Sequence, residues 1–232
     1  MTELRFTAIV PAAGVGARMR ADKPKQYLKI HNKTILEHTL EKILSHPYID
    51  KVVVAVSKDD PYFDSLEVSH SPQVIRVNGG SERSDSVLNA LKYVVREKLS
   101  TWVLVHDAAR PCVRLSDISA LIDEATSHPV GAILAAPVRD TMKQSDCNGE
   151  IETTVDRAVL WHALTPQMFR SEQLAEALTK AMFHNVTITD EASAMEWLGM
   201  KPKLVTGRMD NLKITQPEDL DLAEFYLTRD KG

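Results

Sequence analysis

The sequence has few cysteines, no long apolar run and no excess of positive charge, and each absence excludes a class of protein. Its 232 residues include only Cys112 and Cys147, without metal-site spacing, which predicts reduced thiols in a cytoplasmic protein. No stretch approaches the roughly 18 apolar residues of a membrane span, and the first residues lack a signal-peptide pattern. A net charge of −4 argues against broad nucleic-acid binding. We therefore expect neither a membrane nor a nucleic-acid partner.

Linkers, internal repeats and low-complexity tracts are also missing, which predicts a single domain over residues 1–232. The composition, 44% hydrophobic and 26% charged, is typical of a globular protein. A chain of this length is able to bury a full core.

Apolar runs alternate with segments of helical periodicity along most of the chain. Five runs are expected strands: Phe6–Val10, Val52–Ser57, Val74–Asn78, Trp102–His106 and Ala132–Pro137. Three segments between them have apolar residues at helical spacing: Ile35–Leu44, Ser84–Arg96 and Leu115–Ala125. Strands that are apolar on both faces and separated by helices predict an α/β fold with a mostly parallel sheet covered on both faces.

The loop after the first expected strand has the composition of an anion-binding loop. It reads Pro11-Ala12-Ala13-Gly14-Val15-Gly16-Ala17-Arg18-Met19, and Lys25 follows shortly afterwards. Small residues let backbone N–H groups approach a ligand closely, and consecutive N–H groups form a concavity of positive potential. Ligands of parallel sheets bind where the strands end. We therefore predict a triphosphate-binding loop, with Arg18 and Lys25 as its cations.

Two better-known glycine motifs do not fit this loop. A Walker loop requires a lysine directly after its last glycine, and none follows Gly16. A dinucleotide fingerprint requires glycine or alanine where Met19 stands, which argues against a dehydrogenase. The remaining pattern, Gly-x-Gly-x-Arg-Met followed by Pro-Lys, resembles that of sugar-type nucleotidyltransferases. A glycine turn with two surface cations is the alternative.

Two further strand ends carry polar groups. The segment Gly79–Ser86 either opens a helix capped by Ser84 or Ser86 or forms a base-recognition loop whose backbone bonds a pyrimidine edge. Asp107 ends an apolar strand, and we expect it to hold Mg²⁺, which one or two carboxylates and substrate phosphates typically bind. Arg110 is expected to pair with a neighbouring carboxylate.

From about residue 138 to 158 the pattern changes and predicts a protruding β-hairpin arm. Asn148-Gly149, between Asp140–Gln144 and Ile151–Val155, is the strongest short hairpin signal. A lone hairpin is marginally stable, and a second copy of the chain is an economical surface for it. We predict a homodimer built through the arm. The alternative is a hairpin that lies flat on its own core.

Beyond the arm we expect a short edge segment, Leu164–Phe169, and two helices, Ser171–Phe183 and Asp190–Leu198. Thr189 is expected at the N-cap of the second helix, where its hydroxyl either caps the helix or faces a ligand. Lys213 is expected to project from a short strand, either into solvent or into the site.

These motifs, taken together in this order, resemble the 2-C-methyl-D-erythritol 4-phosphate cytidylyltransferase family over nearly the whole chain. The motifs are Pro11–Met19, Pro24–Tyr27, Gly79-Gly80 with Arg83–Val87, Val105–Pro111, Pro137-Val138 with Asp140–Lys143, Thr154–Arg157, Thr189–Ser193 and Asn211–Thr215. The resemblance implies a Rossmann-like core, a protruding arm and a homodimer.

The resemblance also implies roles for individual residues. The catalytic candidates are Arg18, Lys25, Lys213 and Arg157, and Asp107 would help to hold Mg²⁺ or another divalent cation. The nucleotide-binding candidates are Pro11, Ala12, Ala13, Gly14, Gly16, Gly80, Ser81, Ser86, Asp107 and Ala108. The substrate-binding candidates are Asp107, Arg110, Thr141, Arg157, Thr165, Thr189 and Lys213, of which Thr141 and Arg157 would serve the partner subunit. Ser81 stands where some relatives carry an acidic residue.

The implied reaction transfers CMP from CTP to 2-C-methyl-D-erythritol 4-phosphate and releases pyrophosphate. The substrate phosphate would attack the α-phosphorus in line, and with a second pKa of about 6 it needs no general base at neutral pH. Two alternatives remain. One is a cytidylyltransferase for another polyol phosphate, such as ribitol 5-phosphate, and the other is a nucleotide-binding regulatory protein without turnover.

Overall fold

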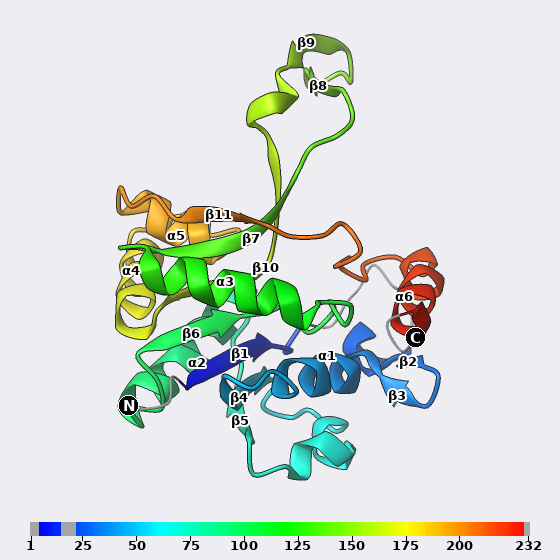
Figure 1. Ribbon diagram of the computed structural model, residues 1–232, viewed down its shortest axis with the longest axis vertical. Coiled ribbons are helices and arrows are strands. Elements are labelled where there is room, and N and C mark those ends of the chain that lie inside the picture. Colours follow the sequence, from blue (N-terminus) through cyan, green and yellow to red (C-terminus); the bar gives the residue numbers. More distant parts are fainter. Residues whose placement is uncertain (1–4, 15–21, 230–232) are drawn as a thin grey trace.

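The computed structural model describes residues 5–14 and 22–229, and its core is a seven-stranded sheet in the order β11-β7-β10-β6-β1-β4-β5 (Figure 1). Neighbouring strands are parallel except at β10, which runs antiparallel to both β6 and β7. The prediction of a mostly parallel, Rossmann-like sheet is confirmed. The strands are β1 Phe6–Pro11, β4 Ile49–Val56, β5 Val74–Asn78, β6 Trp102–Val105, β7 Gly131–Pro137, β10 Trp161–Arg170 and β11 Lys203–Thr206.

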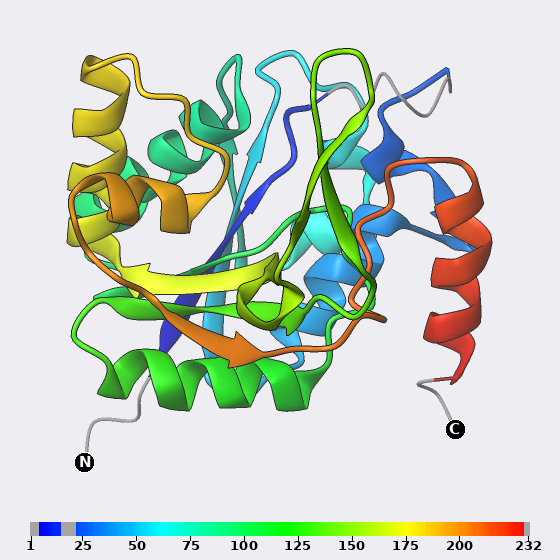
Figure 2. The same cartoon turned by 90° about the horizontal axis from the view of Figure 1, so that it is seen from above.

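Helices cover both faces of this sheet (Figures 1 and 2). On β1, Ala8 and Val10 pack in one buried cluster with α1 and α3, whereas Ile9 packs in a second cluster with α2, α4 and α5. This alternation follows from the period of two along a strand, and it explains why the strand is apolar throughout. The helices are α1 Ile35–Leu44, α2 Arg83–Arg96, α3 Leu115–Ser127, α4 Ser171–Phe183, α5 Glu191–Trp197 and α6 Glu218–Arg229.

Short elements complete the described part of the chain. Two small hairpin strands, β2 Lys29–Ile30 and β3 Lys33–Thr34, precede α1, and four 3₁₀ turns cover Lys25–Tyr27, Phe63–Ser65, Glu67–His70 and Arg157–Val159. None of the helices within the described ranges has the length and apolar character needed to cross a bilayer.

The helix caps differ from those that we predicted. Glu82, not Ser84 or Ser86, stands at the N-cap of α2, where the Asp85 carboxylate accepts the Glu82 N–H at 3.0 Å. Asp190, not Thr189, caps α5, because its carboxylate accepts the backbone N–H of Ser193 at 2.9 Å. In both helices a carboxylate, the stronger acceptor, fixes the first turn.

The expected edge segment Leu164–Phe169 is wrong, because it belongs to the ten-residue β10 inside the sheet. Within this segment, Pro166 donates no hydrogen bond to a neighbouring strand. It is accommodated because the pairing of β10 with β7 shifts register between Ala163 and Gln167. The short strand expected around Lys213 is also absent, and Ile214 is held by a single backbone bond to the carbonyl of Ala109 at 2.9 Å.

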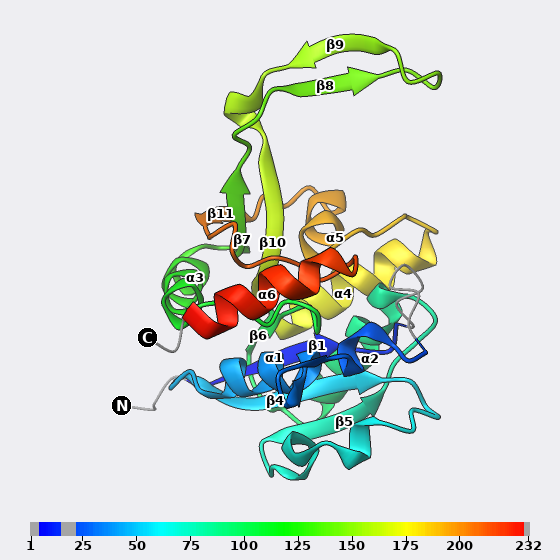
Figure 3. The ribbon, with the colours of Figure 1, turned by 90° about the vertical axis from the view of Figure 1, so that its right-hand side faces the viewer.

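The hairpin arm is confirmed. Its strands, β8 Met142–Ser145 and β9 Ile151–Val155, pair antiparallel and stand away from the body on the extended ends of β7 and β10 (Figure 3). Gly149 has a φ of 85°, as the turn requires. The side chain of Ile151 is 66% exposed, so the alternative of a hairpin lying on its own core is wrong.

Candidate active site

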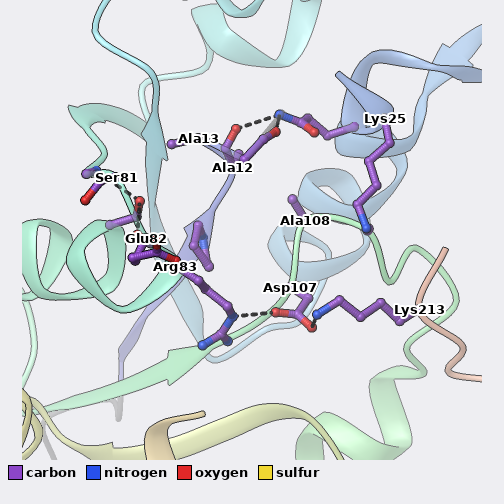
Figure 4. Close-up of a pocket in the computed structure, with 15 residues that line it drawn as sticks. Ala12, Ala13, Lys25, Ser81, Glu82, Arg83, Asp107, Ala108 and Lys213 are labelled. Carbon is purple, nitrogen blue, oxygen red and sulfur yellow. Dashed lines mark hydrogen bonds and ion pairs between the residues drawn. The ribbon is translucent and has the colours of Figure 1, made fainter. Parts of the chain in front are cut away.

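A pocket lies at the carboxyl ends of β1, β5 and β6, where the parallel sheet predicts a ligand site (Figure 4). Loops after these three strands provide most of its wall, and Lys25 and Lys213 close one side. The lining residues are Pro11, Ala12, Ala13, Gly14, Lys25, Gln26, Gly80, Ser81, Glu82, Arg83, Ser86, Asp107, Ala108, Ala109 and Lys213. The predicted residues Gly16 and Arg18 lie outside the described residues.

The small-residue loop after β1 is held open by Gln26. The Gln26 amide donates to the carbonyls of Ala12 at 2.7 Å and Gly14 at 3.0 Å. A Cβ at Gly79 would lie 2.5 Å from the Cβ of Ala13, so the glycine permits the two loops to approach. Sequence reasoning assigned no role to Gln26, although it belongs to the motif that carries Lys25.

The loop after β5 is equally compact. The Ser86 hydroxyl accepts the Gly80 N–H at 3.0 Å, and the Ser81 hydroxyl donates to Asp85 at 2.7 Å. A Cβ at Gly80 would lie 2.2 Å from the Cβ of Asp85. The side chains of Ser81 and Ser86 therefore brace the loop, and residues Gly80–Arg83 line the pocket.

Three cations surround the Asp107 carboxylate at the floor of the pocket. Arg83 Nε donates to Oδ1 at 2.9 Å, while Lys213 Nζ lies 2.9 Å and Arg110 Nε 3.4 Å from Oδ2. Burial raises the pKa of Asp107, but these cations outweigh it and hold the pKa well below its usual range. Asp107 is therefore ionised at any physiological pH. Figure 4 shows Arg83 and Lys213 approaching it from opposite sides.

Thr165 and Arg110, both predicted to bind substrate, instead lie behind Asp107. The Thr165 hydroxyl accepts the Asp107 N–H at 3.1 Å and lies 3.0 Å from His106 Nδ1, while His106 Nε2 lies 2.9 Å from the carbonyl of Arg110. Burial lowers the pKa of His106 to about 4, so its neutral ring donates to Arg110 and accepts from Thr165. Arg110 pairs with a carboxylate, as predicted, and also donates to the carbonyl of Asn211 at 2.6 Å.

The two pocket lysines converge although they are far apart in the sequence. Lys25 Nζ donates to the carbonyl of Ile214 at 2.7 Å, one residue beyond Lys213. Asn211 anchors the same segment through its amide, which donates to the carbonyl of Thr165 at 2.7 Å. Ile214 is fully buried, so Lys213 projects away from the core and towards Asp107.

The remaining predicted residues do not join the pocket of their own chain. Thr141 and Arg157 are exposed on the arm, and the Arg157 guanidinium donates to the backbone carbonyl of Arg139. Thr189 is exposed just before α5. Arg83 and Glu191 also form part of the charge cluster. The sequence analysis gave neither residue a site role, although both belong to motifs that carry the family resemblance.

The donor set is compatible with a divalent cation that is bound mainly by a substrate. Within the part of the chain that the structure describes, no group of three or more His, Cys, Asp or Glu side chains gathers to hold a metal ion. Mg²⁺ commonly uses one or two carboxylates and takes its other ligands from phosphates and water. Asp107 fits the place of the single carboxylate.

Comparisons with known proteins identify the same family over nearly the whole chain. Residues 6–229 match the family model for 2-C-methyl-D-erythritol 4-phosphate cytidylyltransferase. A protein of that name from Vibrio cholerae serotype O1 is 67% identical over 97% of both chains, and one from Aliivibrio fischeri is 61% identical over 99% of this chain and 97% of its own length.

Solved structures are similar as well. The crystal structure of a 4-diphosphocytidyl-2C-methyl-D-erythritol synthase has a TM-score of 0.84 and 39% identity, covering 98% of this chain and 100% of that one. The 2-C-methyl-D-erythritol 4-phosphate cytidylyltransferase of Francisella tularensis has a TM-score of 0.81 and 37% identity, covering 96% of this chain and 99% of its own.

Proposed function

The chain belongs to the 2-C-methyl-D-erythritol 4-phosphate cytidylyltransferase family, and we propose that its reaction takes place in the pocket around Asp107. It is a nucleotidyltransferase that transfers CMP from CTP to 2-C-methyl-D-erythritol 4-phosphate, giving 4-diphosphocytidyl-2-C-methyl-D-erythritol and pyrophosphate. The observation that carries the placement is the convergence of a small-residue loop, Lys25 and Lys213 in one pocket.

Cytidine lies against the two glycine- and alanine-containing loops. Ala12, Ala13 and Gly80 line the pocket there without bulky side chains, so backbone groups are able to approach the base and ribose. Ser86 contributes by holding the Gly80 N–H rather than by touching the nucleotide. Pro11, Gly14 and Ala108 complete this wall.

The triphosphate lies towards Lys25 and Lys213. Each ammonium group already has an oxygen partner, the Ile214 carbonyl for Lys25 and Asp107 for Lys213. These contacts hold the two cations in place before the negative charge develops on the α-phosphate and the leaving group. Preorganised cations of this kind accelerate phosphoryl transfer by positioning and electrostatic stabilisation. Arg18, in the motif Pro11–Met19, is a further phosphate ligand.

Mg²⁺ is the cofactor of the proposed site, with Asp107 as its protein ligand. Its positive charge would offset the negative charge of the triphosphate and of the leaving pyrophosphate. Asp107 has two oxygens with three cationic neighbours, so most of the remaining ligands come from phosphate and water.

The nucleophile needs no proton acceptor from the protein. A phosphate monoester is largely dianionic at neutral pH because its second pKa is about 6. His106, the histidine beside Asp107, is fully buried and engaged with Thr165 and Arg110. The in-line attack on the α-phosphorus therefore depends on positioning, and Lys25 and Lys213 keep the two polyanions together.

The acceptor phosphate is bound by Thr141 and Arg157 from the arm of a second copy in a homodimer. The arm stands away from the body of its own chain (Figure 3), and its two-stranded sheet is marginal without a surface to pack on. Ile151 and Met142, 66% and 36% exposed, provide apolar surface for such packing. The exposed Thr189 lies on the acceptor side of the same site.

Pyrophosphate release with CTP and Mg²⁺ tests this function directly. We expect fast release with 2-C-methyl-D-erythritol 4-phosphate and slow release with ribitol 5-phosphate. The opposite preference would contradict the acceptor assignment but leave the pocket intact. CTP binding without release in either reaction would contradict the catalytic roles.

A further inference from the structure

Glu191, the first residue of α5, is a buried carboxylate outside the pocket lining. Its side chain is 1% exposed, and both of its oxygens accept hydrogen bonds from Arg83, Oε1 from Nη1 at 2.7 Å and Oε2 from Nη2 at 3.1 Å. The two residues lie 108 positions apart. A buried carboxylate is costly unless a cation compensates it, so this pairing constrains both partners.

Arg83 connects Glu191 to the charge cluster of the pocket. Its two terminal nitrogens face Glu191, while its Nε donates to Oδ1 of Asp107 at 2.9 Å. The guanidinium is therefore shared between two carboxylates. Because Arg83 meets only Oδ1 of Asp107, Oδ2 remains available to Lys213 at 2.9 Å, with Arg110 Nε farther away at 3.4 Å (Figure 4).

Removing the charge of Glu191 would change this division. Guanidinium and carboxylate groups favour a two-point contact, and Arg83 would then be free to turn its terminal nitrogens towards Asp107. Such a contact would occupy Oδ2 and compete with Lys213. Glu191 thus keeps the two terminal nitrogens of Arg83 away from Asp107, which Arg83 contacts only through Nε.

Glu191 is itself held rigidly from the other side. The side-chain oxygen Oε1 of Gln167 accepts the Ala192 N–H at 2.9 Å. The side-chain nitrogen Nε2 of Gln167 donates to the Asp190 carboxylate at 2.9 Å. Gln167 lies on β10, within the central sheet. The first turn of α5 therefore provides a fixed anchor for Arg83.

We propose that Glu191 is a positioning residue of the cytidylyltransferase site, which fixes Arg83 so that Asp107 retains one oxygen for Lys213. This role rests on the proposed function, because it concerns the orientation of a proposed catalytic lysine. Glu191 itself touches neither substrate.

The test compares Glu191→Gln with Glu196→Gln in steady-state kinetics of the full chain. Each variant removes one carboxylate from α5, but Glu191 contacts Arg83 whereas Glu196 is exposed. We expect Glu191→Gln to lower kcat about ten- to hundredfold, in the range of a lost charge-assisted hydrogen bond. The KM for CTP should change less than about threefold, because Lys25 and the small-residue loop remain. Glu196→Gln should keep a kcat close to that of the wild type.

A second comparison keeps the proposal testable if Glu191→Gln folds poorly. Arg83→Met leaves Glu191 buried without its cation, whereas Arg83→Met combined with Glu191→Gln removes both charges and should melt at a higher temperature than Arg83→Met alone. If Glu191 acts only through Arg83, the combined variant has the same kcat as Arg83→Met, with no further loss.

Three results would overturn the role of Glu191: a wild-type kcat in Glu191→Gln, an equal loss in Glu196→Gln, or losses that multiply in the combined variant. A wild-type chain that releases no pyrophosphate would instead contradict the proposed function itself.

Discussion

The pocket and the arm carry proposed site residues of similar chemistry in opposite surroundings. In the pocket, Asp107 is ringed by Arg83, Lys213 and Arg110, and its backbone N–H is bound by Thr165. On the arm, Arg157 is exposed and bonds only a nearby backbone carbonyl among the contacts described. One chain therefore preorganises the pocket, whereas we propose that the arm contributes to a site only in a second molecule.

Removing the pocket lysines should give the largest effect and tests the preorganised pocket most directly. Lys25→Ala and Lys213→Ala should each lower kcat roughly a hundred- to thousandfold, the usual cost of losing a preorganised donor. Lys203→Ala, which removes an exposed lysine paired with Glu124 at the sheet edge, is the matched control and should be unaffected. Near-normal turnover in both pocket variants would contradict their assignment.

The buried part of the pocket should also control stability towards acid. The pKa of His106 is lowered from 6.5 to about 4, so below about pH 6.5 the unfolded chain binds a proton that the folded chain does not. The free energy of unfolding should therefore fall by about 3 kcal/mol between pH 7 and pH 4 because of this residue.

Urea unfolding at several pH values measures this effect. His106→Gln should be less stable at pH 7 but show a correspondingly weaker pH dependence. His70→Gln, which changes an exposed histidine, should follow the wild type. Equal pH dependence in wild type and His106→Gln would contradict the buried neutral ring.

A change on the arm should affect acceptor binding and leave the fold unchanged. Arg157→Ala should raise the KM for 2-C-methyl-D-erythritol 4-phosphate about ten- to hundredfold, because one charged contact to a phosphate is lost. The affinity for CTP and the melting temperature should stay near wild-type values. Glu152→Ala on the same hairpin is the control. An altered CTP affinity alone would contradict the assignment of Arg157 to the acceptor.

Mixing two impaired chains tests whether the arm serves its own pocket or that of a partner. In a dimer of Lys213→Ala with Arg157→Ala, an arm that reaches across leaves one site with both residues intact. Mixed and re-equilibrated chains should then recover up to about a quarter of wild-type activity, because half of the dimers are mixed and each has one intact site. No recovery despite exchange of subunits would place the arm at its own pocket.

Local patterns in the sequence predicted much of this molecule. The alternation of apolar strands and helices predicted the sheet, and Asn148-Gly149 predicted the arm. The pattern failed at Leu164–Phe169, which we expected at an edge although it lies in β10 inside the sheet, where a register shift accommodates Pro166. The pattern also failed at the helix caps, where the carboxylate of Asp190, and not the hydroxyl of its neighbour Thr189, accepts the backbone N–H of Ser193.

The side-chain pairing within the site was harder to predict for a physical reason. Arg83 and Glu191 meet only after two distant helices have packed, and no periodicity relates positions 108 residues apart. Thr165 was predicted to bind substrate, and in this structure its hydroxyl contacts the Asp107 N–H and His106. Which polar side chain faces the pocket and which supports it from behind depends on the packed fold.

The contact between Lys25 and Ile214 has a consequence for the chain during its synthesis. The two residues are separated by 189 positions, and at about 5–20 residues per second the ribosome needs roughly ten to forty seconds to add the later partner after the first. Gln26 is able to secure the small-residue loop early in that interval, since Ala12 and Gly14 lie close by in the sequence. The Lys25 side of the pocket is therefore synthesised long before Lys213, and the contact with Ile214 is able to form only when synthesis is nearly complete.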